Sequence, residues 1–321
     1  MKKSFGYILI AVGVLIAINA ANPMRFISGE GWIFRSQKVH EEQSLEIGGI
    51  RSIQIESGST DVEIAPGSSD RIQVWLSGKA SGKYADKLQL SVEPQGDMAR
   101  IVVDIPNQTG FGFQKRSLNL HVEVPEAQWK SLAVESSSGD IRLEQVKADQ
   151  LRVKASSGDL HLEQLKGERI TAIASSGDIR AVELEATTVD LHTSSGNITA
   201  DRYTAGELKF EATSGDVTLM DGQGIVSGHT TSGGIRLEAD ELTRHTELKG
   251  TSGDVVVALS NKPKSLKLEY GSGSGEGKVE WEGLSYTVRQ EEGRRIEGTY
   301  GTGEVKLSVR TSSGDFKLEK R

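Results

Sequence analysis

The residues best placed to do chemistry are the carboxylates of a recurrent Ser-Gly-Asp motif. Asp140, Asp159 and Asp178 follow one another at intervals of nineteen residues. A row of carboxylates suggests Ca²⁺ binding, but Ca²⁺ takes six to eight oxygen ligands and each motif supplies one carboxylate. We therefore expect the motifs to be structural corners, with a row of calcium sites as the alternative. The expected corner residues are Gly139, Asp140, Gly158, Asp159, Gly177, Asp178, Gly196, Asn197, Gly215, Asp216, Gly253, Asp254, Gly314 and Asp315.

A second candidate is the glycine-rich segment Gly271–Lys278, which resembles a phosphate-binding loop. Such a loop needs a glycine five residues before the glycine that precedes the lysine, and a Ser or Thr after the lysine. Ser272 occupies the first position and Val279 the second. The segment is therefore expected to form another corner.

Other catalytic arrangements are missing from the sequence. None of the six His has the spacing of a zinc-peptidase motif, no nucleophile elbow occurs, and the absence of Cys removes thiol chemistry. We expect no catalytic, cofactor-binding or metal-binding residues. The alternative is a solenoid carbohydrate-active enzyme, a lyase or glycosidase, whose acidic residues and sugar-stacking aromatic would be Glu280, Glu282 and Trp281.

The spacing of the motifs predicts the elements that carry them. From Gly139 to Gly253 the motif glycines are 19, 19, 19, 19, 18 and 20 residues apart. Apolar residues alternate with polar ones on both sides of each motif, which indicates half-buried strands. We therefore predict an all-β fold, a parallel β-helix-like solenoid with coils of about 19 residues. A hairpin sandwich would explain the alternation but not the fixed interval. Looser copies of the motif follow at Ser274-Gly275-Glu276, Thr302-Gly303-Glu304 and Ser313-Gly314-Asp315.

Each residue type in the motif has an expected structural role. The glycine would adopt a positive φ, the preceding serine would point inward and form a column, and the aspartate would accept backbone hydrogen bonds. Stacked coils lie about 4.8 Å apart. At an effective dielectric constant of about 20, carboxylates at this spacing repel by roughly 3.5 kcal/mol before screening, so hydrogen bonds or another effect must offset the repulsion.

The chain is expected to divide into four parts. Residues 1–24 form a membrane anchor or signal peptide, 25–48 a tether, 49–125 an irregular N-terminal β region that caps the coils, and 126–321 the regular β-strand repeats with a C-terminal cap. The charged residues 319–321 would discourage end-to-end strand addition.

The N-terminal segment predicts the location of the protein. Residues 4–24 are uncharged, which is long enough for one transmembrane helix, and Lys2 and Lys3 favour a cytoplasmic N-terminus. We expect a single-pass protein of the cell membrane with its β domain outside the cytoplasm. If the segment is instead a cleaved signal peptide, the protein is secreted.

Composition agrees with an exported protein. The net charge is −7 with no basic cluster, which argues against nucleic-acid binding. The absence of Cys suits a chain that folds outside the cytoplasm without oxidation.

The N-terminal anchor, the strand end Val122–Pro125 and the run of Ser-Gly-Asp corners resemble a known bacterial group. This is the β-strand-repeat "putative adhesin" domain family of unknown function, which includes the LiaG-like membrane-anchored proteins. The resemblance covers residues 49–321 and brings no catalytic residues. It implies a non-catalytic cell-envelope binding or scaffolding module with a link to envelope stress. The implied partners are the membrane through residues 4–24 and a cell-wall polymer, surface glycan or membrane protein. An accessory role in a membrane sensor complex is the further alternative.

Overall fold

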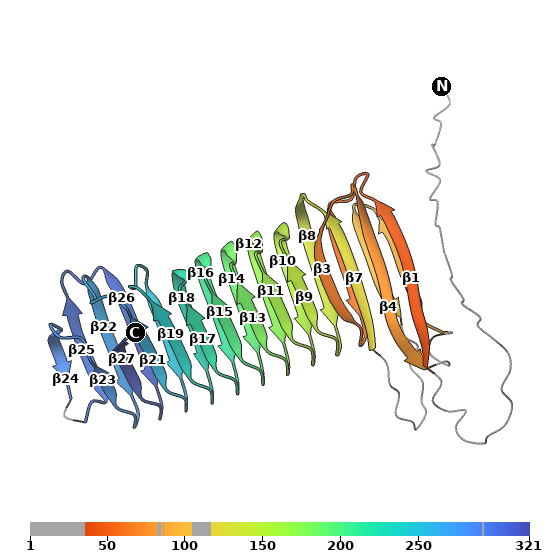
Figure 1. The fold of residues 1–321 in the computed structure, drawn as a ribbon. Helices are drawn as coiled ribbons and strands as arrows, with labels where there is room; N and C mark the ends of the chain where they lie inside the picture. Colours follow the sequence, from red (N-terminus) through yellow and green to blue (C-terminus); the bar gives the residue numbers. More distant parts are fainter. Residues whose placement is uncertain (1–35, 82–84, 86, 105–116, 291) are drawn as a thin grey trace, which may run out of the picture.

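The computed structural model describes residues 36–81, 85, 87–104, 117–290 and 292–321, and its fold is all-β (Figure 1). The expected membrane anchor, residues 1–24, and the first part of the tether lie outside the described residues. Within the described part of the chain, no helix has the length and apolar character needed to cross a membrane. The described strands form two long sheets that face each other and enclose one continuous apolar core.

Each sheet runs the whole length of the solenoid. In spatial order, the 13-stranded sheet contains β1 (Ser36–Glu46), β4 (Arg71–Ser81), β7 (Ser117–Pro125), β3 (Asp61–Gly67), β9 (Ile141–Glu144), β11 (Leu160–Glu163), β13 (Ile179–Val182), β15 (Ile198–Asp201), β17 (Val217–Met220), β19 (Ile235–Ala239), β21 (Val255–Leu259), β27 (Phe316–Lys320) and β23 (Gly277–Val279). The 14-stranded sheet contains β24 (Ser285–Arg289), β25 (Arg295–Tyr300), β22 (Leu266–Ser272), β26 (Val305–Thr311), β20 (Thr246–Gly250), β18 (Gln223–Thr230), β16 (Thr204–Ala212), β14 (Glu185–Thr193), β12 (Lys166–Ala174), β10 (Lys147–Ala155), β8 (Gln128–Ser136), β2 (Ser52–Ser57), β6 (Met98–Asp104) and β5 (Gln89–Gln95).

One coil consists of a long strand, a four-residue first corner, a short strand and a second corner. Strand β10, the corner 156–159 and strand β11 make one such coil, and β12 and β13 begin the next. Successive coils pair in parallel with Leu151 opposite Ile170, a register of nineteen residues. Because the period equals the register, identical positions stack and every apolar side chain of one face enters the core.

The glycine of the first corner is required for close backbone approach rather than for a positive φ, so the expected reason is wrong. A Cβ on Gly177 would lie 2.0 Å from the carbonyl oxygen of Gly158 in the neighbouring coil. Left-handed backbone occurs instead at the second corner, where it is adopted by side-chain-bearing residues. These are Gln145, Gln164, Glu183, Arg202 and Asp221, with φ between 49° and 56°.

The predicted inward column of serines is also corrected. The serine directly before the corner glycine, such as Ser138, is exposed. The inward position lies three residues before the glycine, where Ser136 accepts a hydrogen bond of 2.9 Å from the N–H of Gly139 and Thr193 accepts one of 3.1 Å from Gly196. Other coils place alanine there, because only a small side chain fits under the turning backbone.

The order of coils in space differs from the order in the chain at both ends. Strands β6 and β7 lie outside β2 and β3, and strands β22 and β23 lie outside β26 and β27. The charged residues 319–321 therefore lie at the end of an interior strand, β27, which is flanked by β21 and β23, and do not protect the end of the sheet. Antiparallel strands cap both ends, namely β1, β4 and β5 at one and β24 and β25 at the other.

The segment assigned to a tether is partly a strand. Residues 36–46 form β1, which pairs with β4 over its whole length. Val39 and Leu45 are buried, since alternate residues of this strand face the core. The sequence analysis missed the strand because its inward positions also include polar residues.

Candidate functional site

The predicted corner residues stack into one ladder along the solenoid. The corner glycine of an interior coil contacts the preceding corner. In all these coils but that of Gly234, the side-chain Oδ1 of the aspartate, or of Asn197, accepts a hydrogen bond from the backbone N–H of the equivalent residue in the next coil. Donor–acceptor distances along the ladder are 2.7–3.0 Å. The ladder contains, in spatial order, Asp61, Asp140, Asp159, Asp178, Asn197, Asp216, Gly234, Asp254, Asp315 and Glu276.

These hydrogen bonds offset the repulsion between neighbouring carboxylates, since each carboxylate faces a backbone dipole of the next coil. Gly234 has no side chain, so the ladder is interrupted between Asp216 and Asp254. The copy at Thr302-Gly303-Glu304 does not join the ladder, because it forms the turn between β25 and β26. Residues Gly58–Asp61 form a first corner of the usual length, with Thr60 in the position of the glycine. The ladder thus builds the first corners.

Of the three residues that would serve a carbohydrate-active enzyme, Trp281 and Glu280 make structural contacts and Glu282 is exposed. The indole N–H of Trp281 donates to the carbonyl of Glu319 at 3.1 Å, and the ammonium of Lys320 lies 5.3 Å from the ring centroid. Glu280 forms ion pairs with two lysines, at 3.3 Å with Lys317 and at 3.8 Å with Lys278. Trp281 therefore helps to hold strand β27 in place.

The outer faces of both sheets are largely self-neutralising. On the 13-stranded sheet Arg236 pairs with Glu238 two residues further along the same strand. On the 14-stranded sheet Lys209 pairs with Glu207 at 3.1 Å in the same way. Exposed pairs of this kind contribute little to stability, but they cancel charge over most of the rod.

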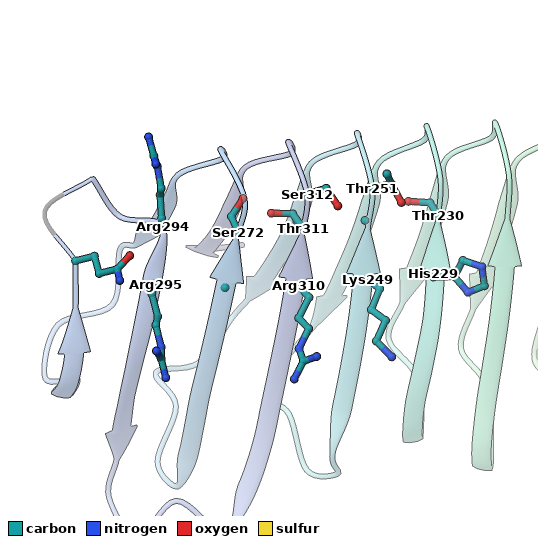
Figure 2. A pocket seen from close by; sticks show the side chains of 13 residues that line it. His229, Thr230, Lys249, Thr251, Ser272, Arg294, Arg295, Arg310, Thr311 and Ser312 are labelled. Carbon is teal, nitrogen blue, oxygen red and sulfur yellow. The ribbon is translucent and has the colours of Figure 1, made fainter.

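A cleft on the outer face of the 14-stranded sheet departs from this pattern. It has a volume of about 660 Å³ and lies at the C-terminal end, over strands β18, β20, β26, β22 and β25 (Figure 2). Among the described residues that line it there is no Asp or Glu. The cations that line it are Lys249, Arg294, Arg295 and Arg310, with His229 at one end. A protein of net charge −7 thus has a hollow lined by positive charge at this end of the described structure.

The lining residues form two rows that run across the strands, along the solenoid axis (Figure 2). Lys249 lies opposite Arg310, Arg310 opposite Gly271, and Gly271 opposite Arg295, so these positions form one row on four neighbouring strands. We call this the cationic row. The hydroxyl groups of Thr251 and Ser312 line the cleft beside it, and we call them the hydroxyl row.

The cations of the cleft keep free hydrogen-bond donors. Lys249 pairs with Glu247 at 2.7 Å, and this hydrogen bond, together with the charge of Lys249, lowers the pKa of Glu247. Arg295 pairs with Glu297 at 2.6 Å. The guanidinium of Arg310 makes no hydrogen bond or ion pair within the described part of the chain, although its charge helps to lower the pKa of Glu247. Because a guanidinium has five N–H donors and no acceptor, Arg310 is the group most ready to receive an anion.

Sequence reasoning missed the cleft because its residues are far apart in the chain and the last coils are not stacked in chain order. A usable signal is nevertheless present. Four positions along the line of the cationic row each lie four residues before a corner glycine. The pairs are His229 and Gly233, Lys249 and Gly253, Arg310 and Gly314, and Gly271 and Gly275. An alignment of the repeats on those glycines would therefore place these four residues at the same repeat position.

A model of the Toastrack DUF4097 family matches residues 50–319. The chain belongs to this family. No curated protein matches the chain.

Solved structures of proteins from Parabacteroides species are similar to this chain. One is named a "putative adhesin" from Parabacteroides distasonis, with TM-score 0.51, 12% identity, and coverage of 88% of this chain and 97% of that chain. A "putative adhesin" from Parabacteroides merdae has TM-score 0.49 and 13% identity over 88% and 96% of the two chains. A "putative lipid binding protein" from Parabacteroides distasonis has TM-score 0.45 and 17% identity over 87% and 96%. At these identities the likeness concerns the fold alone.

Proposed function

We propose that this Toastrack protein is a non-catalytic, membrane-anchored module of the cell envelope that binds an anionic envelope component in its C-terminal cleft. The observation that carries the proposal is the cleft itself, in which four cations and no described carboxylate line a hollow of about 660 Å³ on an acidic protein. The uncharged segment 4–24 supports anchoring, because its length suits one membrane-spanning helix.

The position of the cleft along the rod suits this role. Strand β1 follows the N-terminal segment and lies at one end of the 13-stranded sheet, whereas the coil of β26 and β27 lies close to the other end (Figure 1). Eleven strand spacings separate β1 from β27 in the sheet order, which amounts to roughly 50 Å. A chain anchored before β1 would hold the cleft at that distance from its attachment point.

A binding role also fits the chemistry of the cleft. Its side chains donate hydrogen bonds and carry positive charge, and the nearby carboxylates Glu247, Glu292 and Glu297 are engaged by Lys249, Arg294 and Arg295. Such a set can hold an anion, whereas glycoside cleavage needs a free acid and a base on either side of a bond.

Co-sedimentation of the detergent-solubilised full-length chain with purified cell envelopes tests the proposal. We expect saturable binding that weakens with salt, since exposed charges are screened. Arg310→Gln should weaken binding, and the matched control Arg180→Gln should leave it unchanged because Arg180 is an exposed outward residue of the opposite sheet. Absence of binding, or equal effects of the two substitutions, would refute the proposal.

Anchoring is tested separately by cell fractionation. The chain should sediment with membranes and resist extraction by carbonate, and removal of residues 1–24 should release it. Recovery of the intact full-length chain in the soluble fraction would contradict anchoring.

A further inference from the structure

We propose that the ligand of the cleft is a linear polymer of hydroxyl-bearing units joined by phosphodiester groups, and that it lies along the solenoid axis. This inference rests on the proposed function and assigns the chemical class of its ligand. It follows from the kinds of donors in the cleft, from their arrangement in rows, and from the gap at Gly271.

The donors favour tetrahedral oxyanions. Three of the four cations that line the cleft are arginines, whose planar fork can donate two parallel hydrogen bonds to a phosphate. The guanidinium of Arg310, at the middle of the cationic row, has no hydrogen-bond or ion-pair partner among the described residues, and Lys249 beside it keeps two N–H donors beyond its bond to Glu247. One phosphate can therefore lie between Lys249 and Arg310 and receive donors from both.

The rows favour a chain rather than a compact anion. From Lys249 to Arg295 the cationic row crosses three strand spacings, or roughly 14 Å. This length exceeds a single phosphate and matches a short stretch of a polymer with two or more charged groups. The row also runs parallel to the axis, so an extended chain can touch every member without bending (Figure 2).

Gly271 provides the room for such a chain. A Cβ added at this glycine would meet no atom within 4 Å, and its φ is outside the left-handed region. The missing side chain leaves open space between Arg310 and Arg295, where the backbone of a polymer can approach the sheet.

The hydroxyl row explains why the units should carry hydroxyl groups. The side chains of Thr251 and Ser312 make no hydrogen bond with another described residue. Ser272, opposite Thr311, accepts a bond of 2.7 Å from the N–H of Gly275 and so holds the corner beside this row. Hydroxyls that donate and accept complement a polyol or sugar unit, while the cationic row holds the phosphodiesters.

Competition at the full-length chain bound to cell envelopes tests the ligand class. The competitors are a polyglycerol phosphate, a polygalacturonate of equal charge, inorganic phosphate, and vesicles of phosphatidylglycerol or phosphatidylcholine. We expect polyglycerol phosphate to displace the envelopes at a concentration at least tenfold lower than polygalacturonate or inorganic phosphate. Stronger competition by phosphatidylglycerol vesicles than by the polymer would assign the phosphate to a lipid headgroup and overturn the polymer.

Two substitutions at Gly271 test whether the polymer binds in the cleft, and neither should disturb the fold. Gly271→Glu places a carboxylate between Arg310 and Arg295 and should weaken polyglycerol phosphate binding more than tenfold. Gly271→Gln, of nearly the same size, should weaken it less than threefold. Both variants should unfold at the urea concentration of the wild type, because the added side chain meets open space.

The outcomes separate this inference from the proposed function. Envelope binding that polyglycerol phosphate does not displace, or that Gly271→Glu and Gly271→Gln reduce equally, would overturn the ligand class and leave envelope binding standing. Absence of envelope binding with the wild-type chain would refute the proposed function itself.

Discussion

Replacing Gly177 by alanine will drive a methyl group into the backbone of the neighbouring coil. The Cβ would lie 2.0 Å from the carbonyl oxygen of Gly158 and 2.6 Å from its carbonyl carbon. A methyl carbon does not approach an oxygen closer than about 3 Å, so the two corners must separate by roughly 1 Å. Rigid backbone surrounds both atoms, so rotation of a side chain cannot relieve the contact.

The size of the effect follows from the hydrogen bonds that join these two corners. Four of them, with lengths of 2.8–3.2 Å, would stretch beyond bonding distance. At about 1 kcal/mol each, with partial relaxation, Gly177→Ala should lower the free energy of unfolding by about 2–4 kcal/mol. Gly58→Ala is the matched control in another corner, since its Cβ would meet no atom within 4 Å, and it should change stability by less than about 0.5 kcal/mol.

Urea unfolding followed by circular dichroism measures the change in the free energy of unfolding of the whole protein. Hydrogen exchange of peptides from residues 156–180 measures the loss of protection at the two corners. Gly177→Asn separates the two explanations for the glycine. Asparagine enters left-handed backbone more readily than alanine, so it would be tolerated better if the glycine served a positive φ. We expect Asn to be at least as damaging as Ala. Similar stability of Gly177→Ala and Gly58→Ala would refute the close-approach argument.

Three further changes test other parts of the structure. Asp159→Asn should keep the ladder acceptor and cost less than about 0.5 kcal/mol, whereas Asp159→Ala should cost about 1 kcal/mol by urea unfolding; equal costs would contradict the ladder. Gly234→Asn should supply the missing rung and stabilise the protein by up to about 1 kcal/mol, because its Cβ meets no atom closer than 3.4 Å, and a loss of stability would count against it. Arg321 donates to Asp221 at 3.1 Å and lowers its pKa below the usual 3.8, so this pair stabilises the fold above that pH and the contribution disappears as pH falls through the lowered value. Arg321→Gln should therefore be less stable than the wild type at pH 7, by less than about 1 kcal/mol, and the difference should shrink as the pH falls below 3.8; a difference that does not shrink would exclude the pair as its cause.

The sequence predicted the architecture well because the solenoid repeats the same interaction. Alternation around Leu151 and Val153 gave the strands, and the interval of nineteen residues gave parallel stacking in register. The glycine column was found as well, although its reason was misread. The sequence pattern shows that glycine recurs at this position. It does not show why, because the backbone that excludes a Cβ belongs to the neighbouring coil.

Features that depend on long-range order were not predictable in the same way. The coil of β26 and β27 inserts between two earlier coils, so sequence neighbours are not spatial neighbours at the C-terminal end. The cleft joins Lys249, Gly271, Arg295 and Arg310 through that insertion. Strand β1 was assigned to a tether because its alternation is interrupted by polar residues on the inward side.

Hydrogen exchange of the full-length chain, with and without cell envelope fragments, tests most directly whether the C-terminal cleft is the binding site. The measurement maps contact along the rod and does not depend on the identity of the ligand. We expect protection of peptides that contain Lys249, Gly271, Arg295 and Arg310, with little change in strands β1–β6 at the opposite end. Protection confined to the N-terminal strands, or an unchanged exchange pattern at saturating envelope concentration, would contradict the assignment.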